Sequence, residues 1–162
     1  MSDDSNSSAS MTIDDLRDRL QGDRTAMLTT VDERGTLSAR PLSIQTYNDF
    51  GDVFFLVSRD ADWVSVGTEA ANVAIVDDGS TWLSIAGRLH ITDEAKLLDE
   101  LWNDDAAAWF PDGKSTAMVA HVQSDRWEYW TAPNAAVQVV EFVKAKVTDS
   151  APDLGESGTI ET

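Results

Sequence analysis

The chain has no cysteine and very little histidine. Among its 162 residues there are only two histidines, His90 and His121. The lack of cysteine excludes disulfide bonds, thiolate metal sites and thiol nucleophiles. Two histidines are too few for a histidine-based metal centre, and both fall in patterns that predict strands, where a histidine is more often structural than catalytic. The sequence therefore predicts no metal site.

Long apolar runs and signal-peptide patterns are also absent from the sequence. A membrane-spanning helix needs about 20 consecutive apolar residues. A secretory signal places a basic segment before a shorter apolar one. These absences predict a cytoplasmic protein that does not bind membranes.

Positive charge is scarce. The chain has 12 basic residues against 29 acidic ones, a formal net charge of −17. Such a surface repels phosphate backbones and anionic lipids, so nucleic acid and membranes are excluded as partners. An acidic, lysine-poor surface also suggests a protein that works at high salt, where self-repulsion is screened.

A chain of this length is expected to form one domain, with a core that needs no disulfide or metal. Its first residues are mostly Ser, Asp and Asn, and its last ones are polar with Gly and Pro. Such compositions favour disorder. We therefore expect a disordered tail over residues 1–11, one domain over 12–147 and a flexible tail over 148–162.

Apolar patterns and turn signals predict a series of strands with a few short helices. A continuous apolar run over 53–57 predicts a strand that is covered on both faces. Gly87 interrupts a long strand pattern, which indicates a bulge or the close approach of another backbone. The predicted strands cover residues 26–31, 37–47, 53–57, 71–76, 82–91, one or two segments of 116–130, and 137–147. The predicted helices cover residues 12–22, 60–67, 93–102 and 104–109. Strands at this spacing predict a mainly β fold, a closed barrel with peripheral helices.

The hairpin over residues 26–44 contains the most distinctive local pattern. Gly35 ends a short polar turn, as a hairpin requires, and Pro41 lies within the second strand. Because proline has no N–H to donate, it marks an edge or a bulge. Arg40 beside it could point at a ligand. The alternative is an ordinary edge hairpin with a solvated arginine.

Six tryptophans are a high count for a chain of this size. Aromatic side chains dominate cores and subunit interfaces, and most of the six are expected there. One or two of them could form the walls of a site for a flat ligand.

The order of these features resembles the pyridoxamine 5'-phosphate oxidase-like FMN-binding split-barrel family, in particular its general stress protein 26 branch. The resemblance covers roughly residues 12–147. It rests on three local patterns in the right order: Ser38-Ala39-Arg40-Pro41-Leu42, Leu101-Trp102 leading to Trp109-Phe110-Pro111-Asp112-Gly113, and Glu128-Tyr129-Trp130. It implies a homodimer with a flavin groove at the subunit interface.

The resemblance also implies which residues contact the cofactor. The family places its flavin against the Arg-Pro strand, the Phe-Phe strand and aromatic residues of the partner chain. The corresponding positions here are Ser38, Arg40, Pro41, Leu42, Phe55, Leu56 and Trp82, with Trp109 and Trp130 on the partner side.

The sequence departs from the family at the cofactor phosphate. Family members usually have a basic residue just after the Phe-Phe strand, often a lysine preceded by a small or hydroxyl residue, whereas Trp63 stands here and Asp62 precedes it. A carboxylate near a phosphate is repulsive, so Arg59 or Arg40 would have to supply the positive charge. Trp82 also replaces a polar flavin-contacting residue of the oxidase itself.

The resemblance implies a function in redox chemistry. The leading hypothesis is an FMN-binding, flavin-dependent oxidoreductase, with its catalytic residues unknown. Oxidation of pyridoxamine phosphate is disfavoured because no second basic cluster is available for the phosphate of that substrate. The alternatives are a deazaflavin-dependent reductase, and a non-catalytic protein that stores flavin or has lost its cofactor.

Overall fold

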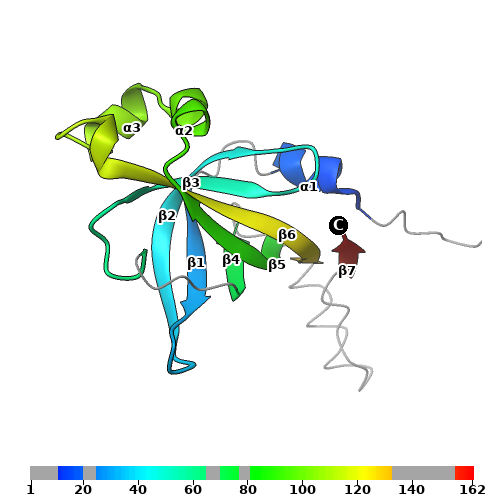
Figure 1. Cartoon of the computed structure of the whole chain (residues 1–162). Helices are drawn as coiled ribbons and strands as arrows, with labels where there is room; N and C mark the ends of the chain where they lie inside the picture. The colour runs from blue at the N-terminus through cyan, green and yellow to red at the C-terminus, as the bar shows by residue number, and fades with distance from the viewer. Residues whose placement is uncertain (1–10, 20–24, 65–69, 77–80, 133–155) are drawn as a thin grey trace, which may run out of the picture.

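A computed structural model describes residues 11–19, 25–64, 70–76, 81–132 and 156–162. Its strands form one antiparallel sheet in the order β3-β2-β1-β4-β5-β6-β7. Strand β6 also pairs with β3, so the strands β1 to β6 close into a barrel (Figure 1). Strand β7 lies antiparallel beside β6 and is not part of the closed ring. The strands are β1 (Thr25–Val31), β2 (Leu37–Tyr47), β3 (Val53–Ser58), β4 (Ala70–Val76), β5 (Thr81–Thr92), β6 (Ala117–Thr131) and β7 (Glu156–Glu161). The helices are α1 (Ile13–Arg19), α2 (Ala95–Leu101), α3 (Asp104–Trp109) and the 3-10 turn η1 (Lys114–Thr116). The predicted mainly β barrel is confirmed.

Strand β6 closes the barrel because it is long enough to take two partners on one side. Its first half pairs with β3 and its second half with β7, while β5 runs along its other side. The β5–β6 register shifts between Ala86 and Gly87, which confirms the predicted bulge. A Cβ at Gly87 would lie 2.0 Å from the carbonyl oxygen of Gln123, so only glycine fits there.

The barrel interior is filled by alternate residues of its strands. Phe55, Ile85 and Trp127 are fully buried there, and Leu16 of α1 joins the same cluster. This burial of large apolar side chains stabilises the barrel, and it fixes which residues of each strand point outward.

A second apolar cluster lies outside the barrel, where α2 and α3 cover β3 and β6 (Figure 1). Phe54 and Leu56 on the outer face of β3 pack with Leu98 and Leu101 of α2 and with Ala106 of α3. Both faces of β3 are therefore buried, as the continuous apolar run predicted.

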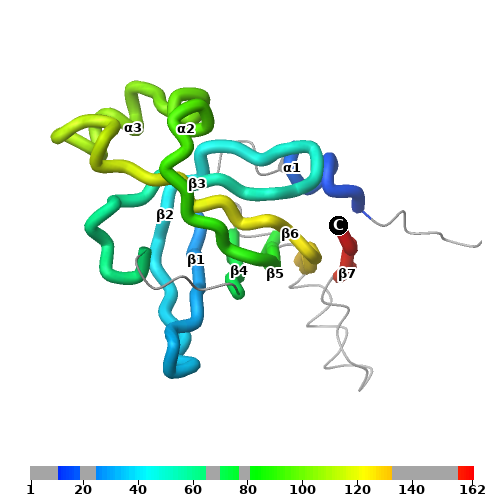
Figure 2. Tube along the Cα trace, viewed as in Figure 1, coloured from blue at the N-terminus to red at the C-terminus, as the bar shows by residue number. Residues whose placement is uncertain are grey.

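Two predictions of local structure are wrong. Residues 61–64, within the predicted helix 60–67, form turns in which Val64 N donates to the carbonyl of Ala61 at 2.9 Å. The predicted flexible tail contains the strand β7 (Figure 2), and Ile160 of this strand packs against the barrel core. A polar segment can complete a sheet through its backbone, which composition does not reveal. The predictions for residues 1–10, 20–24, 65–69, 77–80 and 133–155, among them the last part of the helix over 60–67 and the strand over 137–147, lie outside the described residues.

In the part of the chain that the structure describes, no helix is long and apolar enough to cross a membrane.

Candidate functional site

The barrel is closed between β2 and β3 over only part of their length, and the two strands leave an opening beyond it. These strands pair only where Ile44, Thr46 and Tyr47 of β2 meet Phe55, Phe54 and Val53 of β3. Beyond that point residues 37–43 pair only with β1 and residues 56–58 only with β6, among the described strands. Each of the two segments therefore has one backbone edge with no strand paired to it. Pro41 lies on such an edge, as predicted.

A groove of about 310 Å³ lies at this opening. Strands β2 and β3 form its floor, and its walls come from the turn after β3 and from the end of α3. It is lined by Pro41, Leu42, Ser43, Gln45, Leu56, Val57, Ser58, Ala61, Trp63, Ala106, Trp109 and Phe110. None of these side chains is charged. Two free backbone edges between aromatic walls suit a flat heteroaromatic ligand with polar groups along its rim.

The structure brings several of the sequence-predicted residues together in this groove. Pro41, Leu42, Leu56 and Trp63 all line it. Trp109 lines it too, although it was expected to contribute from the partner chain. The residue is 75% exposed, so this tryptophan forms the outer rim of the groove within the same chain.

Arg40 lies next to the groove without lining it. Its guanidinium carbon is 4.4 Å from the ring centroid of Trp63, which is a cation–π contact. Nη1 donates to the hydroxyl of Thr30 at 3.0 Å and Nη2 to the carbonyl of Ser38 at 3.3 Å. Burial lowers the pKa of Arg40, but an arginine in a protein stays protonated. A fixed positive charge therefore stands at the side of an uncharged groove.

Other sequence-predicted residues have different surroundings. Arg59 forms an ion pair with Asp93 at 3.4 Å and donates to the carbonyl of Ser115, so its charge is already balanced. Phe55 is fully buried in the barrel core and does not line the groove. The exposed Ser38 contributes only its carbonyl, which accepts from Arg40.

Trp82 and Trp130 do not line the groove. They lie opposite one another on β5 and β6, and Val76 of β4 lies opposite Trp82. The three side chains are 40%, 45% and 55% exposed in the order Trp82, Trp130, Val76. They form an apolar patch on the outer face of the sheet.

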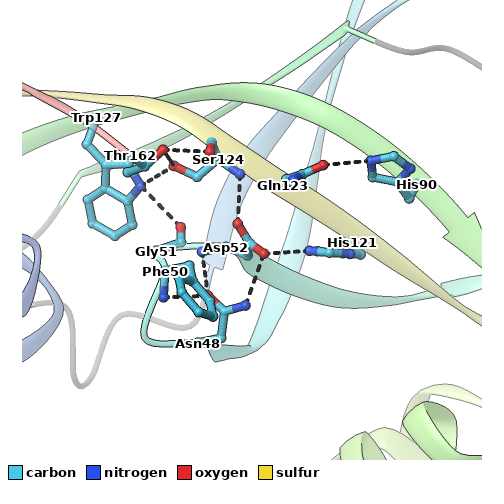
Figure 3. Close-up of polar contacts among 10 residues, drawn as sticks. All are labelled: Asn48, Phe50, Gly51, Asp52, His90, His121, Gln123, Ser124, Trp127 and Thr162. Atoms are coloured by element: carbon cyan, nitrogen blue, oxygen red, sulfur yellow. Dashed lines mark hydrogen bonds and ion pairs between the residues drawn. The ribbon is translucent and has the colours of Figure 1, made fainter.

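A polar cluster that sequence reasoning missed is centred on Asp52, which is only 8% exposed (Figure 3). Its carboxylate accepts from the backbone N–H of Ser124 at 2.9 Å and from Nδ2 of Asn48 at 3.0 Å. The ring Nε2 of His121 lies 2.9 Å from the same carboxylate. Burial acts to raise the pKa of Asp52, but the hydrogen bonds from Ser124, His121 and Asn48 and the charge of His121 outweigh it, so the pKa is lowered.

The Asp52 cluster ties distant segments together. The hydroxyl of Ser124 lies 2.8 Å from Nε1 of Trp127, and the Thr162 hydroxyl donates to the Ser124 carbonyl (Figure 3). The β2–β3 turn, the bulge of β6 and the end of the chain thus meet at one point. Only the pattern of Asn48 and Asp52 at a turn could have hinted at this, because Ser124 is 72 positions away from Asp52. Within the described ranges, no group of three His, Asp or Glu side chains could hold a metal ion.

Comparisons with known proteins agree with the fold. The family model described as pyridoxamine 5'-phosphate oxidase like matches residues 11–153. No curated protein matches the chain at a significant level.

Among solved structures, a candidate general stress protein 26 from Jannaschia sp. CCS1 is 29% identical, with a TM-score of 0.67, and the match covers 90% of this chain and 94% of that one. The general stress FMN/FAD binding protein from Xanthomonas citri is 28% identical with a TM-score of 0.62, over 72% of this chain and 86% of that one. A protein from Clostridium acetobutylicum related to general stress protein 26 is 12% identical with a TM-score of 0.69, over 92% and 93% of the two chains.

Proposed function

The chain belongs to the pyridoxamine 5'-phosphate oxidase like family, and on that premise we propose that it is a flavoprotein that binds FMN in the groove between β2 and β3. The observation that carries the proposal is the pair of free backbone edges, residues 37–43 and 56–58, flanked by aromatic walls. A flavin ring is flat and has alternating hydrogen-bond donors and acceptors along one rim. The 28% identical Xanthomonas citri protein, described as FMN/FAD binding, supports the same ligand class.

The residues present fit a flavin. Between Pro41 and Ser43 and between Leu56 and Ser58, backbone groups on the edge without a paired strand would bond the polar rim of the ring. Pro41 has no N–H to donate, and two carbonyls already accept hydrogen bonds, that of Ser43 from Nε2 of Gln45 at 3.3 Å and that of Ser58 from the N–H of Ala61 at 3.2 Å. Trp63 and Trp109 would cover its faces or edges and exclude water from it. Bound there, the flavin would supply hydride and electron transfer. The protein would then act as an oxidoreductase, with its chain orienting the ring.

The phosphate of FMN would be held by Arg40 rather than by Arg59. Arg59 is engaged with Asp93, whereas the hydrogen bonds of Arg40 go to neutral oxygens. A phosphate at the end of the flavin side chain would therefore extend past Trp63 toward Arg40.

We propose that the chain acts as a homodimer. The patch of Val76, Trp82 and Trp130 exposes large apolar side chains side by side on one sheet face. A two-fold axis would bury this patch against its own copy. In that arrangement the two tryptophans serve the interface, and a ligand contact by either would come from the partner chain.

The test is the visible absorption spectrum of the purified protein after saturation with FMN and removal of free ligand. We expect flavin bands, perturbed from those of free FMN, at one flavin per chain. A single deazaflavin-type band in the protein as isolated would favour the deazaflavin-dependent reductase. Protein absorbance alone, with no retention of added flavin, would favour the non-catalytic alternative without cofactor.

A matched pair of variants locates the ligand. Ser43 lines the groove on β2, and Thr36 is exposed in the β1–β2 turn, outside it. We expect Ser43→Trp to fill the groove and prevent retention of FMN, and Thr36→Trp to leave it intact. Equal retention by both variants would place the flavin elsewhere.

A further inference from the structure

The side chain of Trp63 has two neighbours of different kinds. It lines the groove, and it is also the ring over which the guanidinium of Arg40 lies at 4.4 Å. Trp63 belongs to the turn that follows β3, whereas Arg40 lies on β2. The contact therefore spans the opening of the barrel.

The remaining contacts of Arg40 fix its guanidinium without balancing its charge. The Thr30 hydroxyl and the Ser38 carbonyl each accept one hydrogen bond from it, and Thr30 is itself 4% exposed. No carboxylate of the described residues lies within ion-pairing distance of Arg40. In a chain with 29 acidic residues this is unusual for a half-buried cation. Arginine has five N–H donors, so others remain for a ligand.

We propose that Trp63 is a positioning residue that holds Arg40 in place as the anion anchor of the groove. An indole face attracts a guanidinium through its quadrupole and leaves the full positive charge available. A carboxylate partner would cancel that charge, and a lysine in place of Trp63 would repel Arg40. With Trp63 in this position, Arg40 on β2 can bind the phosphate, and no basic residue after β3 is needed for that role. This inference rests on the proposed flavin function for its natural ligand, a flavin with a terminal phosphate.

The competing explanation is that Trp63 is only a wall of the groove. The two explanations differ in which ligands suffer when the ring is removed. A wall contacts FMN and riboflavin alike, whereas an anchor of the phosphate affects only FMN.

The experiment measures dissociation constants of FMN and riboflavin for the wild type, Trp63→Leu and Trp63→Phe. Leucine keeps an apolar wall without a ring, and phenylalanine keeps a ring face. Loss of a partly desolvated cation–π contact is expected to weaken FMN binding about fivefold to tenfold in Trp63→Leu. Riboflavin binding should change much less, and Trp63→Phe should recover most of the preference for FMN. An equal loss of both flavins in Trp63→Leu would overturn the proposal.

A second measurement does not depend on flavin. Protons of an arginine side chain that lies over an indole ring are shifted by its ring current, so the NMR signals of the Arg40 side chain report the stack. We expect shifted signals in the wild type that respond to inorganic phosphate, and both effects lost in Trp63→Leu. If the wild type shows them but retains no flavin, the proposed function fails while the role of Trp63 stands. If the Arg40 signals are the same in Trp63→Leu and the wild type, the role of Trp63 is refuted.

Discussion

Replacing Arg40 by glutamine should separate FMN from riboflavin. The guanidinium lies beside the groove and is bonded only to the Thr30 hydroxyl and the Ser38 carbonyl among described residues, so its charge is available to a phosphate. A hydrogen bond to a charged group is worth about 1.5–3 kcal/mol, which corresponds to about a tenfold to hundredfold change in affinity. We expect Arg40→Gln to weaken FMN binding by that factor.

In the assay, each variant is titrated with FMN and with riboflavin, and binding is measured from the quenching of flavin fluorescence. The salt concentration is high enough to screen the net charge of −17. Riboflavin lacks the phosphate, so its affinity for Arg40→Gln should stay within about threefold of its affinity for the wild type. That change is smaller than the loss of a single hydrogen bond to a charged group would cause. Arg34→Gln is the matched control, because Arg34 is exposed in the β1–β2 turn. Equal affinity of the wild type for FMN and riboflavin would show that Arg40 anchors no phosphate.

Three further predictions follow from other parts of the fold. Asp52→Asn should lower the free energy of unfolding by about 2–4 kcal/mol at pH 7, since it weakens charge-assisted bonds to Ser124 and His121. Because the pKa of Asp52 is lower in the folded state than in the unfolded state, the stability that its charge contributes is fully present above the pKa of the unfolded carboxyl and is lost as the pH falls through the folded pKa. The difference in unfolding free energy between wild type and Asp52→Asn, measured by denaturant titration, should therefore shrink in acid. A difference that grows in acid would contradict the lowered pKa. Gly87→Ala should cost about 1–3 kcal/mol by the same titration, because the added Cβ would meet the Gln123 carbonyl, and an unchanged midpoint would refute the tight bulge. Trp130→Glu should shift the protein from dimer to monomer in sedimentation at high salt, whereas an unchanged dimer would remove the tryptophan patch from the interface.

Local patterns were enough to predict most of the barrel. The apolar run of β3 predicted burial on both faces, and a lone glycine in a long strand predicted the bulge at Gly87. Both signals depend on the neighbours of a residue along one strand. The strand β7 was missed because most of its residues are polar, and its place is decided by the edge of β6 that β3 leaves unpaired.

The site was only partly predictable, because contacts between residues of different strands are not visible in local sequence patterns. Pro41 and Leu42 were expected to contact the ligand from the family resemblance, and they line the groove. The stack of Trp63 on Arg40 depends on how far β2 and β3 diverge, which no local pattern encodes. Trp109 was expected from a partner chain, but the packing of α3 on β3 brings it to the groove of its own chain.

Flavin binding in the groove is tested most directly by a crystal structure of the protein grown with FMN. We expect a flavin ring between the backbone edges of Pro41–Ser43 and Leu56–Ser58, with its phosphate at Arg40. A flavin bound elsewhere, or no bound flavin at a saturating concentration, would contradict it.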